Sequence, residues 1–173
     1  CSQTLSPSLE QLKKQWQLPN NKTIIMLPGR ITRLKGHSVL IHALSKLDTS
    51  NIICLFVGDN HGNTSYQKEL ETLIIQHKLI NTIRLVGGCQ NMAAAYQMTD
   101  IVVSASVKPE SFGRVSCEAQ AMDCLVVATN HGGTREIISD SQKTFLCEPN
   151  NSESMQQALM KALSTTKQAQ ALI

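Results

Sequence analysis

The densest group of chemically useful side chains lies in the segment PESFGRVSCEAQAM, residues 109–122, where Glu110 and Glu118 flank Gly113. Carboxylates accept paired hydrogen bonds from neighbouring hydroxyl groups, such as those of a ribose or a hexose. If a helix begins at the glycine, the free N–H groups of the next three residues point out of its first turn toward an anion. The segment therefore predicts a site for a ligand that carries sugar hydroxyls and negative charge.

Each glutamate also has a simpler interpretation. Glu118 could only complement the partial positive charge of a helix start, which is worth about 0.3 to 1 kcal/mol. Glu110 could be an exposed charge in a loop. The residue types and spacing alone leave both alternatives open.

A second charged turn, PGRITRLKGH at residues 28–37, carries two well-spaced cations. Gly29 lets the chain turn sharply, Arg30 follows it, and Lys35 comes five residues after the arginine. Arginine offers a planar fork of donors and lysine a compact charge, so the pair suits a diphosphate better than either residue alone. A solvated basic loop is the simpler alternative, and Arg33 is expected to point to water.

Other polar residues carry weaker signals. We expect His37 to be a packing or capping residue, whereas His131, beside two glycines, is left open between ligand contact and packing. Asp59 and Asp100 are typical of turn and strand-end positions. The sequence contains no Ser-His-Asp order, zinc-ligand spacing or Walker lysine.

The overall composition favours one globular domain. The chain has 173 residues, 42% of them hydrophobic, and a net charge of +3 that is spread along the sequence, which argues against a nucleic-acid partner. Six cysteines without a C-x-x-C pair predict reduced thiols, a cytoplasmic protein and no metal site. The apolar runs are too short to cross a bilayer. The first residues lack the features of a signal peptide, and we expect a fragment of a longer chain.

The elements that must position these turns follow from the apolar pattern. Short runs rich in Ile, Val and Leu predict strands at residues 23–27, 51–57, 82–86, 100–106, 124–129 and 144–147. Helical periodicity between them predicts helices at residues 37–47, 64–79, 91–98, 114–123 and 154–163. This alternation predicts an α/β fold, a Rossmann-like parallel sheet of about six strands covered by helices on both faces. Ligands should bind in the turns beyond the carboxyl ends of the strands.

Taken together, the turns resemble the C-terminal half of retaining GT-B glycosyltransferases, the glycosyltransferase group 1 family of nucleotide-sugar enzymes. The resemblance covers residues 22–163. It rests on seven motifs in the family's order: GRITRLKG, LFVGD, IRLVGG, AYQMTDIVVSAS, PESFGRVSCEAQAM, VVATNHGGTREII and LCEPNNSESMQQAL. Seven motifs in register are far more specific than one.

The resemblance implies a role for each site residue. Arg30 and Lys35 would hold the donor diphosphate, Glu110 the hydroxyls of the donor sugar, and these three would carry the reaction. The remaining donor-binding residues would be Gly29, Val86 against the base, Phe112, the backbone at Gly113, Arg114 and Val115, and Glu118 on the ribose. Donors aimed at the charge that builds on the departing diphosphate lower the barrier, so no metal is expected.

The resemblance also implies partners. Residues 1–173 would be the C-terminal nucleotide-sugar-binding domain, whose N-terminal acceptor domain lies outside this sequence, so this part alone would transfer nothing. The partners would be a nucleotide sugar, the chain's own N-terminal domain and a glycan or lipid-linked acceptor. The sequence of residues 109–122 resembles the corresponding segment of hexosyltransferases that build bacterial lipopolysaccharide or other envelope glycans. Such an enzyme would be cytoplasmic, or peripheral at the inner face of the membrane through the N-terminal domain.

The sequence departs from the family at two positions. Asp123 stands where most members have glycine and must end its helix in a left-handed conformation, which aspartate tolerates better than most residues. Leu125 stands where proline is common. Two other functions are alternatives: a non-catalytic module that binds a nucleotide or nucleotide sugar, and a phosphorylation-receiver domain. The receiver is disfavoured because it needs an aspartate after the third strand, where this chain has Gly87.

Overall fold

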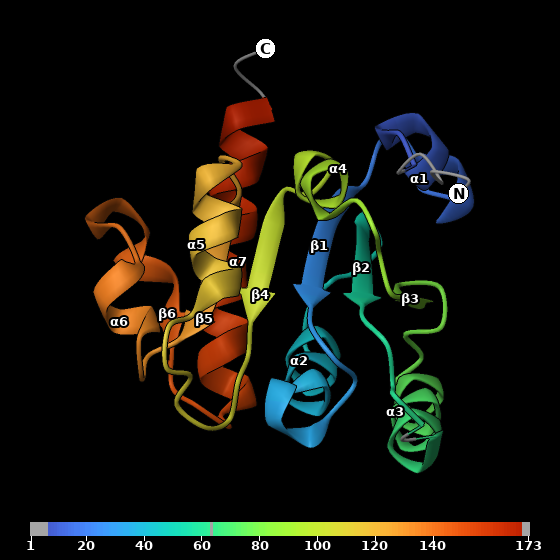
Figure 1. The fold of residues 1–173 in the computed structure, drawn as a ribbon, viewed down its shortest axis with the longest axis horizontal. Coiled ribbons are helices and arrows are strands. Elements are labelled where there is room, and N and C mark those ends of the chain that lie inside the picture. Colours follow the sequence, from blue (N-terminus) through green and yellow to red (C-terminus); the bar gives the residue numbers. More distant parts are fainter. Residues whose placement is uncertain (1–6, 63, 171–173) are drawn as a thin grey trace, which may run out of the picture.

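A parallel sheet forms the centre of the computed structural model, which describes residues 7–62 and 64–170. Its strands are β1 (Thr23–Pro28), β2 (Ile52–Val57), β3 (Ile83–Gly87), β4 (Ile101–Ser104), β5 (Leu125–Thr129) and β6 (Leu146–Cys147). All neighbouring strands pair in parallel, in the order β3-β2-β1-β4-β5-β6. The arrows of β1, β2 and β4 accordingly point the same way in Figure 1. The predicted fold class is confirmed.

Helices cover both faces of this sheet. One face carries α2 (His37–Leu44), α3 (Thr64–Gln76) and α7 (Ser152–Gln170), and the other carries α1 (Leu9–Gln15), α4 (Met92–Gln97) and α5 (Arg114–Ala121). The short α6 (Thr134–Ile137) lies against α5. Alternate strand residues enter the two cores, so that in β1 Ile25 and Leu27 join one core and Ile24 and Met26 the other.

The strand order creates a crevice between β1 and β4. From β1 the chain winds outward through β2 to β3, whereas from β4 it winds the other way through β5 to β6. Loops that leave the carboxyl ends of two such strands diverge to opposite sides, and open α/β sheets bind ligands at this point. The two charged turns of the sequence leave β1 and β4, so the fold brings both to the same crevice.

Several elements differ from the sequence-based expectation, and the short helix α6 is one that it did not include. The sequence analysis did not predict α1, although Ser8 and Gln11 form a capping box at its start. Helix α7 continues to Gln170, beyond its expected end at residue 163, and Thr165 and Thr166 donate their hydroxyls to carbonyls one turn back. Before β6, residues 140–145 form a 3-10 helix, so the strand is shorter than the predicted 144–147.

The departure at Asp123 takes the form that the sequence predicted. Asp123 has a φ of 58°, in the left-handed region. Its N–H donates to the carbonyl of Gln120, and the N–H of Cys124 donates to the carbonyl of Ala119. This pair of bonds is the Schellman motif that ends many helices, usually with glycine at the position of Asp123.

Candidate functional site

The turn after β1 lies directly against the turn after β4. Gly36 has a φ of 71°, and a Cβ atom there would lie 2.0 Å from the carbonyl oxygen of Ala105. Only glycine allows this approach. At the start of the same turn, Gly29 has a φ of 139° and packs against the side chain of Lys35. As a result, Lys35 reaches across the crevice and forms an ion pair with Glu110.

Glu110 is held through one of its two carboxylate oxygens. Its Oε1 atom accepts hydrogen bonds from the Lys35 ammonium and the Ser106 hydroxyl. Burial raises the pKa of Glu110, but the hydrogen bonds from Lys35 and Ser106 and the charge of Lys35 outweigh it, so the pKa lies below its ordinary value. Among the described residues, Oε2 has no hydrogen-bond partner, so an ionised oxygen is left for a ligand.

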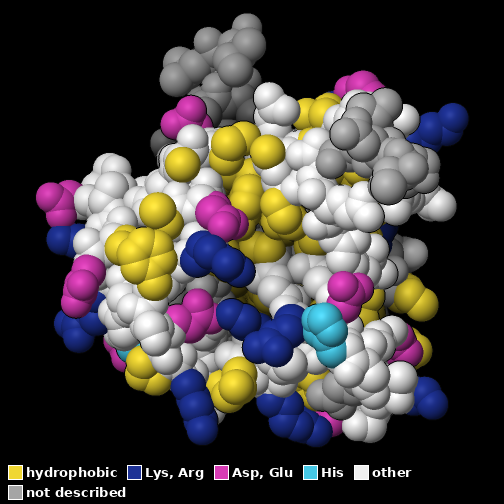
Figure 2. Space-filling model, viewed as in Figure 1, with side chains coloured by type: hydrophobic (Ala, Val, Ile, Leu, Met, Phe, Trp, Pro, Cys, Tyr) yellow, Lys and Arg dark blue, Asp and Glu magenta, His cyan; other side chains and the backbone are white. Residues whose placement is uncertain are grey.

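Two adjoining cavities meet at this ion pair. One, of about 300 Å³, is lined by Arg30, Lys35, Lys108 and Glu110 among others. The other, of about 360 Å³, is lined by Lys35, Glu110 and residues 111–115. Figure 2 shows Lys and Arg side chains gathered in the lower middle of this face, with acidic side chains beside them. Of the predicted site residues, Arg30, Lys35, Glu110, Phe112, Gly113, Arg114 and Val115 line this hollow.

The start of α5 supplies backbone donors to the second cavity. Gly113, with a φ of 62°, precedes Arg114, the first residue of the helix. The amides of Arg114 and Val115 have no acceptor among the described residues, as expected for a helix start. The prediction of a third free amide is wrong, because the N–H of Ser116 donates to the carbonyl of Gly113 at 3.0 Å.

Glu118 and Val86 do not line either cavity. The Oε2 atom of Glu118 accepts a hydrogen bond of 2.9 Å from the Tyr96 hydroxyl, and Oε1 lies 3.6 Å from Nε of Arg114. Burial, together with the hydrogen bond to Glu118, raises the pKa of Tyr96, so this hydroxyl stays a donor. Val86 packs at the edge of the core that Val115 also borders. The sequence analysis missed Tyr96, and nothing in the segment NMAAAYQM signals its contact.

The turn after β5 packs against the loop after β4, which carries Glu110. The N–H of Gly133 donates to the carbonyl of Glu110 at 2.9 Å, and a Cβ on Gly132 would lie 2.6 Å from that same oxygen. Nε2 of His131 lies 2.7 Å from the carbonyl oxygen of Ser106, and since a carbonyl only accepts, this nitrogen carries the proton. The role of His131, open in the sequence, is therefore a contact with the loop that carries Glu110.

The remaining candidates have structural partners. His37 is fully buried, edge-on to the ring of Phe56, as a packing residue. Asp59 accepts from the N–H of Gly88 at 3.0 Å. Arg33 is exposed, as expected, but it forms a bidentate ion pair with Glu69 rather than pointing only to water.

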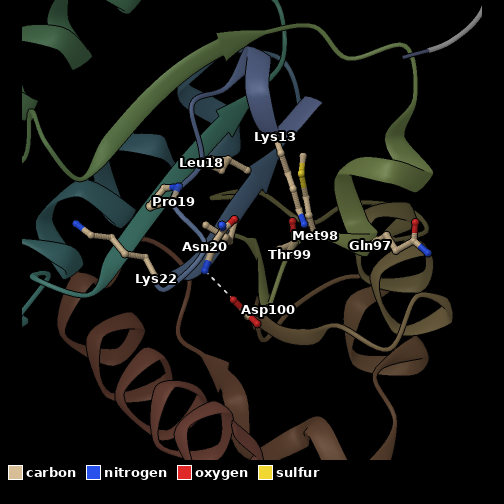
Figure 3. A pocket seen from close by; sticks show the side chains of 10 residues that line it. Lys13, Leu18, Pro19, Asn20, Lys22, Gln97, Met98, Thr99 and Asp100 are labelled. Atoms are coloured by element: carbon tan, nitrogen blue, oxygen red, sulfur yellow. Dashed lines mark hydrogen bonds between the residues drawn. The ribbon is translucent and has the colours of Figure 1, made fainter. Parts of the chain in front are cut away.

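Another cavity, of about 250 Å³, lies at the opposite edge of the sheet, at the amino ends of β1 and β4 (Figure 3). Its one carboxylate, Asp100, accepts a hydrogen bond of 2.7 Å from the N–H of Ile24. Figure 3 shows Lys22 and Gln97 extending away from Asp100 in opposite directions, so these polar groups do not converge. We therefore take the hollow at the carboxyl edge as the candidate functional site.

The chain matches the family model for glycosyl transferases group 1 over residues 8–173. It belongs to this family. The match extends beyond the segment 22–163 in which the sequence resemblance was recognised, and so includes α1 and the end of α7. In fold, the chain corresponds to the C-terminal half of GT-B glycosyltransferases. No helix in the described part of the chain is long and apolar enough to cross a membrane.

Individual proteins show the extent of the similarity. A Rickettsia africae glycosyltransferase is 40% identical, with a TM-score of 0.85 over 90% of this chain and 41% of its own. Anabaena Alr3699/HepE, solved in complex with UDP, is 28% identical, with a TM-score of 0.83 over 91% of this chain and 43% of its own. The lipopolysaccharide 1,2-N-acetylglucosaminetransferase of Salmonella typhimurium is 29% identical over 98% of this chain and 47% of its own length. The chain thus spans less than half the length of these relatives.

Proposed function

We propose that the hollow at the carboxyl edge binds the donor of a retaining, metal-independent hexosyltransferase, a nucleoside-diphosphate sugar. One observation carries the proposal: Lys35 and Glu110 pair where two cavities meet, with Arg30 in one and the free amides of Arg114 and Val115 in the other. These groups suit a ligand with negative charge beside hydroxyl groups. The Anabaena relative, solved with UDP and also with UDP-glucose, supports a ligand of this class.

The chemistry follows from where charge develops. Breaking the bond between the sugar and the diphosphate loads negative charge onto the departing diphosphate. Arg30, Lys35 and the amides at the start of α5 would oppose this charge from fixed positions, which lowers the barrier. Removing one such donor from comparable sites costs about 3 to 4 kcal/mol of transition-state stabilisation. Because the chain's own groups neutralise the leaving group, we expect transfer without an added metal ion.

The other parts of the proposal concern what lies outside this chain. We propose that the acceptor, a glycan or a lipid-linked glycan, binds mainly to an N-terminal domain of the full protein, so that the 173-residue chain alone binds the donor without transferring it. The Salmonella relative supports a place in lipopolysaccharide or other envelope glycan synthesis.

Within this chain, Val86 and Glu118 line neither cavity. We propose that they contact the base and the ribose of the donor, beyond the start of α5.

Calorimetric titration of the chain with UDP, GDP and ADP tests the proposal. We expect one diphosphate to bind, and Arg30→Ala and Lys35→Ala each to weaken it by about 10-fold or more, since a hydrogen bond to a charged group contributes about 1.5 to 3 kcal/mol. Lys46→Ala is the matched control, because Lys46 pairs with Glu153 away from both cavities. Absence of binding at millimolar diphosphate, or equal weakening by the control, would refute the proposal.

A non-catalytic binding module would share this diphosphate site. The full-length protein separates the two functions, because Glu110→Ala should abolish sugar transfer while the folded enzyme still binds the diphosphate. A full-length wild type that binds donors and never turns them over would support the module instead.

A further inference from the structure

Ser106 makes a contact that the diphosphate site does not require. Its side chain is buried, with 5% of the residue exposed, and its hydroxyl donates to Oε1 of Glu110. The same oxygen accepts from the ammonium of Lys35. Two donors on one carboxylate oxygen fix the orientation of the carboxylate and leave Oε2 as its free acceptor.

The backbone of Ser106 is itself held by β5 and the turn after it. Its carbonyl oxygen accepts a hydrogen bond of 3.0 Å from the hydroxyl of Thr129, which is 1% exposed, and one of 2.7 Å from Nε2 of His131. Two side chains from the neighbouring strand and its turn therefore locate the serine that orients Glu110. Residues held in this way by packed strands are more precisely placed than residues of a free loop.

Ser106 and Lys35 differ in what else they can bind. Lys35 lines both cavities, whereas Ser106 lines only the cavity that also holds Arg30. A bound diphosphate would therefore compete with Glu110 for the Lys35 ammonium. The Ser106 hydroxyl donates to Glu110, and no other acceptor for it is found in the described part of the chain. When the diphosphate draws on Lys35, Ser106 is the donor that still holds the carboxylate.

We propose that Ser106 is a positioning residue for sugar transfer: its hydroxyl, located by Thr129 and His131, holds Oε1 of Glu110 so that Oε2 is available to a hydroxyl of the donor sugar. This inference rests on the proposed function. It assigns the recognition of the sugar to a serine that is held by Thr129 of β5 and by His131 in the turn after β5. The diphosphate would instead depend on Arg30, Lys35 and the α5 amides. Loss of the Ser106 hydroxyl should therefore affect the sugar and spare the diphosphate.

Kinetics of the full-length enzyme separate these effects. We expect Ser106→Ala to lower kcat/KM for the donor by about 10- to 100-fold, as loss of a hydrogen bond to a charged group does, with inhibition by the product nucleoside diphosphate unchanged. Ser106→Thr keeps the hydroxyl and should restore activity to within about three-fold of the wild type. Ser164→Ala, which removes a hydroxyl bonded to Met160 on α7, is the control and should leave kcat/KM unchanged. Wild-type activity in Ser106→Ala, or an equal loss of diphosphate affinity, would overturn the assignment.

A second variant and a second measurement guard against misfolding. Thr129→Val is nearly isosteric and removes the hydroxyl that holds the Ser106 carbonyl at 3.0 Å and that also lies 3.4 Å from the Ser104 carbonyl. A smaller loss of kcat/KM, about three- to ten-fold, is therefore expected. In the 173-residue chain, NMR of the Glu110 side-chain carboxyl should find its pKa raised in Ser106→Ala and restored in Ser106→Thr. A pKa that does not move would refute the contact, even if the wild type proved to transfer no sugar and the proposed function itself failed.

Discussion

Glu110 and Glu118 are the same residue type in the same motif, yet their environments differ. Glu110 lies between two cavities and keeps one oxygen free, because Lys35 and Ser106 share the other. Glu118 has both oxygens near donors, from Tyr96 and Arg114. The proposed difference in role, donor sugar against ribose, therefore has a physical counterpart in how each carboxylate is held.

His37 makes a prediction about stability and pH. Burial lowers its pKa to about 4, although the nearby backbone of Thr32 favours the protonated ring. Neither ring nitrogen has a hydrogen-bond partner among residues 7–62 and 64–170. The folded ring therefore stays neutral where the unfolded ring, with its pKa of 6.5, takes up a proton. The free energy of unfolding should be fully retained above pH 6.5 and fall as the pH drops toward 4, by up to about 3 kcal/mol from this group.

The variant His37→Leu isolates this contribution. Its free energy of unfolding should fall less between pH 6.5 and pH 4 than that of the wild type, because leucine cannot take up a proton. At pH 7 the variant should be about as stable as the wild type, since two unpaired buried nitrogens are removed. Urea denaturation of both proteins at pH 7 and pH 4.5 measures the difference. An equal drop in the free energy of unfolding of both proteins between pH 7 and pH 4.5 would contradict the role given to His37.

Residue types could be predicted from the sequence, but their partners could not. Arg30, Lys35 and Glu110 stand in motifs that suggest anion and hydroxyl binding, and the structure places them around one hollow. The contacts of Ser106 with Thr129 and His131 join turns that are more than twenty residues apart. No local spacing encodes such contacts, because they depend on how β4 and β5 pair and on where their turns then meet.

At the level of elements, close packing of turns locates the site. Gly36 lies against Ala105 of the β4 turn, and Gly132 and Gly133 lie against residues 110–112. At these glycines the turns after β1, β4 and β5 therefore approach one another closely enough that an added Cβ would clash with the facing backbone. The sequence marked each turn with glycines, but which turn each glycine would contact became apparent only from the strand order.

The end of α5 offers a test of this element. Asp123 has a φ of 58° and an exposed side chain, in a Schellman motif that favours glycine. Asp123→Gly should raise the free energy of unfolding by about 0.5 to 1 kcal/mol, because the left-handed conformation costs a side chain about 1 to 2 kcal/mol and glycine's greater freedom in the unfolded chain offsets part of the gain. Chemical denaturation of the variant and the wild type measures this difference in the free energy of unfolding.

Asp123→Ala is the matched comparison. Alanine also has a Cβ and lacks the local hydrogen bonding with which aspartate tolerates this conformation, so the variant should be less stable than the wild type. If glycine destabilised the chain as much as alanine does, backbone strain at this position would not be the reason for the family's preference.

At the scale of the whole molecule, the architecture was the most predictable part. Six apolar runs separated by helical segments indicate a parallel sheet with two covered faces, because both faces of each strand must be apolar. The helices α1 and α6 were missed because they are short, and the end of α7 was missed because residues 164–170 are mostly polar. Buried Leu12 and Trp16 tie the α1 segment to the second core.

The length of the chain bears on how the proposed function can be tested. It spans less than half the length of its relatives, and its hollow lies open at the carboxyl edge of one sheet. The proposed donor site is built only from turns of this chain, so the proposed binding can be measured on the chain itself.

The central claim is that cations after β1 and amides at the start of α5 meet on one diphosphate. Backbone amide shifts of the chain, followed by NMR during titration with the diphosphate that binds best in calorimetry, test it most directly. We predict that the largest shifts fall in residues 29–36 and 110–118. Shifts confined to the cavity around Lys13, Lys22 and Asp100, or none at millimolar ligand, would contradict the account.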